Sequence, residues 1–213
     1  MTQSERNTGE NKMRVLGITG GVGAGKSTVL DYLKQRYGAR VLQCDEAAKI
    51  LQEPGGSCYR PMTELLGEDV LGRDGRFDRG KIAAMVFAQE EVLKRLNAIV
   101  HPAVKEYVVK EIHKERERRK HFLFVVEAAL LLEDGYGHIC DEIWYIHADE
   151  RVRRQRLRES RGYSDKKITQ IMSTQHTEEY FRQYCQFTVD NSGDNVENTY
   201  EQIDEGLKTH GFL

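Results

Sequence analysis

The fold is decided by Gly20-Gly21-Val22-Gly23-Ala24-Gly25-Lys26-Ser27, a glycine-rich stretch near the start of the chain. It follows a short apolar run, Arg14 to Thr19, which has the character of a buried strand. It precedes residues 27–37, in which apolar side chains recur with helical spacing until Gly38 ends the pattern. The stretch therefore predicts a loop between a strand and a helix.

Such a loop can bind phosphate, because backbone N–H groups surround phosphate oxygens only where side chains do not intrude. The N-terminus of the following helix adds positive charge. The alternative is a glycine-rich turn that binds no ligand. That alternative is hard to reconcile with four glycines within six positions followed by an intact Lys-Ser pair. The predicted nucleotide-binding residues are Gly21, Val22, Gly23, Ala24, Gly25, Lys26, Ser27 and Thr28.

Two side chains in this loop have specific chemistry. Lys26 is expected to reach the β- and γ-phosphates of ATP. The hydroxyl of Ser27 is expected to ligate Mg²⁺, because this small, hard cation prefers oxygen ligands. The sequence therefore predicts ATP as a substrate and Mg²⁺ as the cofactor.

The remaining apolar runs predict a single α/β domain. Continuous apolar runs are typical of parallel strands buried on both faces, and they occur at 39–44, 122–126, 142–146 and 187–189. Helical patterns cover 81–100 and 104–118. We expect a doubly wound, five-stranded parallel sheet of the P-loop type, with its core in residues 13–53, 121–147 and 186–210. A helical insertion on the substrate side is expected at about 54–120, a lid at about 149–180, and a disordered extension at 1–12.

The composition limits the partners. Lys and Arg total 32 against 34 for Asp and Glu, so a net charge of −2 gives no overall field to attract nucleic acid or a membrane surface. No apolar run approaches the length of a membrane helix. The four cysteines have no paired spacing, and the first twelve residues have no apolar signal-peptide core. We therefore expect reduced thiols and a cytoplasmic protein.

Asp45 directly follows the second predicted strand. It should therefore lie at the carboxyl edge of the sheet, beside the phosphate loop, where doubly wound folds bind ligands. A carboxylate there could accept the proton of an attacking hydroxyl and help to place Mg²⁺. The alternative is a plain helix N-cap.

Arginines are dense after the fourth predicted strand. Guanidinium groups stay ionised and suit the binding of a transferring phosphate. Glutamates are interspersed, so most of these arginines are expected on a solvated, salt-bridged helix, with one or two in contact with ATP. The cluster comprises Arg151, Arg153, Arg154, Arg156, Arg158 and Arg161.

The pattern favours a kinase that acts on a small metabolite. A GTPase would need an N-K-x-D sequence after a later strand, and Asp190-Asn191-Ser192-Gly193 resembles it only superficially. Helical insertions suit a lid that closes over the phosphates and excludes water. A nucleotide-dependent switch without catalysis would keep the loop but would not need Asp45 or the lid arginines.

From Met13 to about Leu207 the chain resembles the dephospho-CoA kinase family. The similarity extends from Leu16 through Thr28, and it continues in Asp45-Glu46-Ala47-Ala48-Lys49, Val100-His101-Pro102, Leu130-Leu131-Leu132-Glu133, Gln175 and Val189-Asp190-Asn191. It implies transfer of the ATP γ-phosphoryl group to the 3′-hydroxyl of dephospho-CoA, which gives CoA and ADP. A nucleoside monophosphate kinase would share the loop but not these further motifs.

The resemblance also implies roles for single residues. The catalytic residues would be Asp45, Lys26 and Arg156. From the lid, ATP would be bound by Arg156 and Arg161. The metal would be held by Ser27 and Asp45. The acceptor would contact Asp45, Lys49, His101 and Leu130. The partners would be ATP and dephospho-CoA, and the protein would be a monomer or a weak homo-oligomer.

The chain departs from the family pattern in several places. Gln43 stands where an aspartate is frequent, Lys49 replaces an arginine, and Ala129 replaces a proline. The spacing from Arg156 to Arg161 is one residue longer than expected.

Two further residues have open roles. Glu127, after the third strand, could hold a Mg²⁺-bound water or serve as a structural acid. His101 precedes Pro102 at an apparent turn into a helix, so a structural role and a substrate contact both remain open.

Overall fold

The computed structural model describes residues 13–213, and it confirms the predicted five-stranded sheet. The strand order is β2-β3-β1-β4-β5, and every neighbouring pair is parallel. The predicted extension 1–12 lies outside the described residues. The strands are β1 (Arg14–Thr19), β2 (Arg40–Gln43), β3 (Leu123–Glu127), β4 (Glu142–His147) and β5 (Phe187–Asp190).

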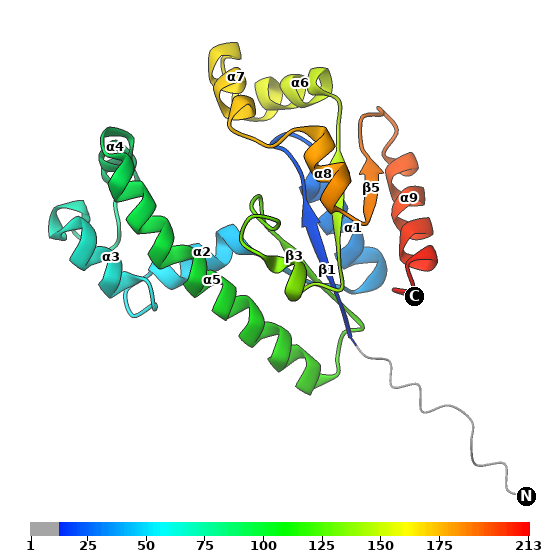
Figure 1. Cartoon of the computed structure of the whole chain (residues 1–213), viewed down its shortest axis with the longest axis horizontal. Helices are drawn as coiled ribbons and strands as arrows, with labels where there is room; N and C mark the ends of the chain where they lie inside the picture. Colours follow the sequence, from blue (N-terminus) through cyan, green and yellow to red (C-terminus); the bar gives the residue numbers. More distant parts are fainter. Residues whose placement is uncertain (1–12) are drawn as a thin grey trace, which may run out of the picture.

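Successive side chains of a strand point to opposite faces of the sheet, and in these strands both sets are apolar. Helices therefore cover both faces (Figure 1). Val15 of β1 belongs to the core beneath α2 (Cys44–Gln52), α3 (Tyr59–Leu66) and α5 (Glu90–Arg118). The next residue, Leu16, belongs to the core beneath α1 (Lys26–Tyr37) and α9 (Val196–Thr209). Within residues 13–213, no helix is long and apolar enough to cross a membrane.

The helical insertion extends away from the sheet (Figure 1). It contains α3, a short 3-10 turn (Glu68–Val70), α4 (Arg79–Ala88) and the long helix α5. The expected turn before Pro102 is wrong, because α5 continues through this proline. Proline in a helix removes one hydrogen bond and costs about 3 kcal/mol. Burial of Val104, Val108 and Ile112 on the following turns offsets this cost.

The segment predicted as the lid lies at the top of Figure 1, whereas the insertion extends to the left. It consists of α6 (Glu150–Arg161), α7 (Asp165–Ser173) and the start of α8 (Glu178–Tyr184). Phe181 of α8 stacks on Tyr145 of β4, with ring centroids 4.7 Å apart. This contact ties the end of the segment to the sheet, so α6 and α7 form its outer part.

Candidate phosphoryl-transfer site

The phosphate loop folds tightly against the carboxyl ends of the strands. Gly20 has φ +149°, and a Cβ there would lie 2.4 Å from the carbonyl oxygen of Ile146. Gly25 has φ +87°, and a Cβ there would lie 2.2 Å from Nδ2 of Asn191. Only glycine fits such close approaches at positive φ. The loop is therefore pressed between the end of β4 and the residue that follows β5.

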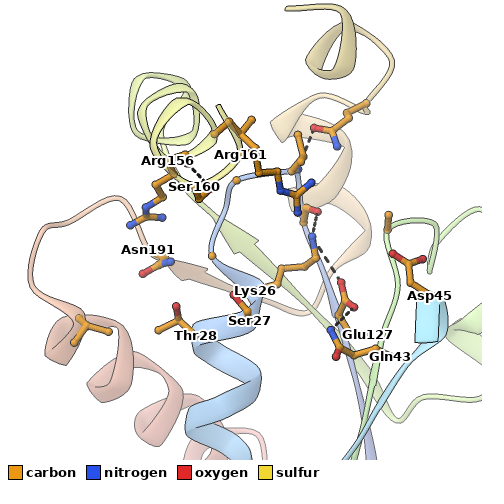
Figure 2. A pocket seen from close by; sticks show the side chains of 18 of the residues that line it. Lys26, Ser27, Thr28, Gln43, Asp45, Glu127, Arg156, Ser160, Arg161 and Asn191 are labelled. Carbon is orange, nitrogen blue, oxygen red and sulfur yellow. Dashed lines mark hydrogen bonds and ion pairs between the residues drawn. The ribbon is translucent and has the colours of Figure 1, made fainter. Parts of the chain in front are cut away.

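A cavity of about 670 Å³ opens beside this loop. In Figure 2, Asp45 and Arg156 lie on opposite sides of it, with Lys26 and Ser27 between them. Gly21 and Ala24 are in the loop but not on the cavity wall, and the Ala24 carbonyl accepts a hydrogen bond from Asn191 Nδ2 at 2.8 Å. The predicted residues that do line the cavity are Val22, Gly23, Gly25, Lys26, Ser27, Thr28, Asp45, Arg156 and Arg161.

Lys26 lies in a polar network at the floor of this cavity. Its Nζ donates to the Gly20 carbonyl at 2.9 Å and lies 3.7 Å from Oε1 of Glu127. Gln43 Nε2 donates to the other carboxylate oxygen of Glu127 at 3.4 Å (Figure 2). The structure thus brings Glu127 beside Lys26, and its role toward Mg²⁺ stays a prediction; the sequence noted Gln43 only as a departure from the family.

Burial shifts both charged groups of this network. Burial lowers the pKa of Lys26, although Glu127 and Asp45 oppose that shift. Burial likewise raises the pKa of Glu127, although Lys26 and then Gln43 oppose the rise. Each charge thus compensates for the desolvation of the other. Anionic phosphate beside Lys26 would favour its protonated form.

Asp45 lies in the first turn of α2 and is exposed at the cavity. The N-cap of α2 is Gln43, and its side chain makes no capping hydrogen bond. The alternative interpretation of Asp45 as a helix N-cap is therefore wrong. Its carboxylate lies at the N-terminal end of α2, where the helix dipole is positive.

A second, smaller cavity of about 170 Å³ adjoins the first. Asp45 and Ala129 line both cavities. The second is also lined by His101 and Leu130, and His101 Nδ1 lies 3.1 Å from Oδ1 of Asp134. The structure thus brings three of the four predicted acceptor residues together.

Lys49 is the fourth, and it is not brought to either cavity. It pairs with Glu46 on the exposed side of α2 and lines a separate hollow that also includes Arg76 and Arg79. Residue 49 is one turn beyond Asp45, so it lies about 6 Å farther along α2 than the shared wall. Its contact with the acceptor stays a prediction.

The arginine cluster contains both surface ion pairs and residues on the cavity wall. Arg154 pairs with Glu150 at 2.7 Å, and Arg158 pairs with Asp165 at 2.5 Å. Arg156 and Arg161 line the cavity. Sequence reasoning missed Arg153, whose Nε donates to the Val22 carbonyl at 2.9 Å. Nothing in the sequence distinguished it from its neighbours.

The oxygen donors of the site suit Mg²⁺. The Ser27 hydroxyl and the carboxylates of Asp45 and Glu127 all line the cavity that contains Lys26. Within residues 13–213, no group of three or more His, Cys, Asp or Glu side chains forms a cage for a metal. Mg²⁺ commonly takes one or two protein oxygens and completes its shell with phosphate and water, which this donor set allows.

Comparison with known proteins gives one consistent result. The family model described as dephospho-CoA kinase matches residues 14–197. A dephospho-CoA kinase of Shouchella clausii is 33% identical over 90% of this chain and 96% of its own length. A crystal structure of a Thermus thermophilus protein superposes with a TM-score of 0.79 at 29% identity, covering 93% of this chain and 97% of that one. A dephospho-CoA kinase structure from Campylobacter jejuni has a TM-score of 0.67 at 17% identity, covers 93% of this chain and 98% of that one, and supports the fold alone.

Proposed function

This chain belongs to the dephospho-CoA kinase family and is an ATP-dependent phosphotransferase of coenzyme A biosynthesis, and we propose how its residues divide the work. The proposed reaction moves the γ-phosphoryl group of ATP to the 3′-hydroxyl of dephospho-CoA. The observation that carries the residue roles is the position of Asp45 on the shared wall of two cavities. A general base must lie within hydrogen-bond reach of the acceptor hydroxyl while that hydroxyl faces the γ-phosphate.

The larger cavity is the proposed site for ATP. The loop amides and Lys26 would hold the phosphates, and Arg156 and Arg161 would approach from the lid. Ser27 and Asp45 would hold Mg²⁺, and the Glu127 carboxylate on the same cavity wall would support its hydration. The chemistry supplied by a bound Mg²⁺ would be positive charge that offsets the negative charge of the phosphates. The segment after β5, which includes Asn191 and Asp194, lines the same cavity and is our candidate for the nucleoside end.

The transfer itself requires positioning more than covalent help. The acceptor oxygen forms a bond to the γ-phosphorus, and its proton passes to the Asp45 carboxylate. The bond between that phosphorus and the β–γ bridging oxygen breaks, and its electron pair leaves with ADP. Lys26 and the lid arginines would stabilise the charge that spreads over the transferring group.

The smaller cavity is the proposed site for the reacting end of dephospho-CoA. It is lined mostly by apolar side chains, including Leu130, and His101 with Asp134 supplies polar groups on one side. Such a mixture is typical of a small-molecule pocket that orients its ligand by a few polar contacts. The other end of the acceptor would extend along the helical insertion.

The His101→Ala variant tests this acceptor site. We expect the KM for dephospho-CoA to rise about tenfold, as one lost hydrogen bond implies, while the KM for ATP stays the same. Steady-state ADP release with each substrate varied in turn measures both constants. His113→Ala, at an exposed position on the same helix, is the matched control and should leave both constants unchanged. An unchanged KM for dephospho-CoA in His101→Ala would remove this residue from the acceptor site.

We also propose a cytoplasmic location. All four cysteines are free, and such thiols are favoured where glutathione and thioredoxin keep proteins reduced. For the assembly, our proposal is a monomer or a weak homo-oligomer, because the proposed roles in transfer are all filled by residues of a single chain.

A further inference from the structure

The peptide group of Val22, at the tip of the phosphate loop, is held by two side chains from the lid segment. Its N–H donates to Oε1 of Gln175 at 3.2 Å, and its carbonyl accepts from Nε of Arg153 at 2.9 Å. Nη2 of Arg153 also donates to the same Gln175 oxygen, at 2.5 Å. These three groups close a ring, which we call the Val22 clasp.

The clasp is a close contact as well as a set of hydrogen bonds. A Cβ on Gly21 would lie 2.4 Å from Nη2 of Arg153, and a Cβ on Gly23 would lie 2.9 Å from the carbonyl oxygen of Arg153. The loop glycines thus leave room for α6 to lie directly on the loop. Burial lowers the pKa of Arg153, but a guanidinium stays charged at neutral pH.

The clasp fixes the part of the lid that carries the cavity arginines. Arg156 is about one turn beyond Arg153 on α6, and its Nη1 lies 3.4 Å from the Ala24 carbonyl. Arg161 ends the same helix and lines the same cavity. Because a helix is rigid over this length, the anchor at Arg153 sets where Arg156 and Arg161 can reach.

We propose that Arg153 and Gln175 are positioning residues that hold the lid helix on the phosphate loop and thereby place Arg156 and Arg161 at the γ-phosphate. Gln175 reaches the cavity wall, but its Oε1 already accepts two hydrogen bonds within the clasp. Both residues therefore act through Val22 and α6. This inference rests on the proposed ATP site, but not on the identity of the acceptor.

A double-mutant cycle tests the clasp, with nucleotide affinity as its main measurement. Arg153→Met and Gln175→Met remove the hydrogen bonds while keeping much of the side-chain volume. We expect each single variant to bind a non-hydrolysable ATP analogue about tenfold more weakly, because hydrogen bonds that involve a charged group are lost. The double variant should bind it no more weakly than the worse single variant, because the two residues form one unit. Arg153→Lys should fall between Arg153→Met and the wild type, because lysine can replace one of the two bonds.

ADP binding separates positioning from a general structural role. If the clasp places Arg156 and Arg161 at the γ-phosphate, the affinity for ADP should change much less than the affinity for the ATP analogue. Arg151→Met, at an exposed position of the same helix, is the matched control and should change neither. Equal losses for both nucleotides, fully additive losses in the double variant, or wild-type affinity in both single variants would each overturn the proposal. These binding measurements contain no acceptor. They therefore test the Val22 clasp even if the acceptor is not dephospho-CoA.

Discussion

Asp45→Asn is expected to lower kcat with dephospho-CoA by about 10³-fold, within the range that general-base catalysis contributes. The amide keeps the size of the side chain but cannot accept the proton of the acceptor hydroxyl at neutral pH. Asp45 is exposed in the first turn of α2 and forms part of both cavities, so its replacement should leave the fold intact. Rapid-quench or steady-state measurement of ADP release gives kcat, and titration with an ATP analogue gives the affinity, which should change little.

Glu46→Gln is the matched control for this variant. Glu46 is the next residue of α2, is exposed, and pairs with Lys49 without lining either cavity. Its loss should leave kcat close to that of the wild type. Near-normal turnover in Asp45→Asn would remove Asp45 as the base and leave it, at most, as a group that places Mg²⁺.

Lys26→Met is expected to reduce kcat/KM for ATP by about 10³-fold or more, because a cation at the transferring phosphate stabilises charge in a site that excludes water. A second effect follows from the buried network. Lys26 is the main group that opposes the rise in the pKa of Glu127, so that pKa should rise further in the variant. Isotope-edited NMR of the Glu127 carboxyl measures the shift, and ADP release measures the loss of activity.

Lys34→Met serves as the control, because Lys34 is exposed in the last turn of the same helix, away from the loop. It should leave both kcat/KM and the titration of Glu127 unchanged. Wild-type ATP binding and turnover in Lys26→Met would contradict the assignment of the larger cavity to ATP.

The sheet could be predicted from the sequence because its strands are buried on both faces. The apolar run at Arg14–Thr19 coincides with β1, and the other four runs differ from the strands by one residue at one or both ends. The insertion was less predictable. Pro102 indicated a break, but tertiary packing of the residues around it kept α5 continuous.

The site also has a predictable and an unpredictable part. That Lys26, Ser27 and Asp45 lie around one cavity could be predicted, because the strand ends and the loop position them locally. The contact of Arg153 with Val22 could not, because it depends on how α6 is rotated over the loop. The same holds for Lys49, which pairs with Glu46 and lines another surface hollow. Spacing along the chain gives the face of a helix, but only packing decides what that face meets.

The most direct test of the central claim is ADP release by the purified protein with ATP and Mg²⁺, in the presence of dephospho-CoA, AMP, shikimate or no acceptor. We expect turnover that depends selectively on dephospho-CoA, with CoA as the product identified by mass. Selective turnover with another acceptor would keep the phosphate loop and its kinase chemistry but would contradict dephospho-CoA as the substrate. ATP binding without any acceptor-dependent turnover would contradict the kinase itself.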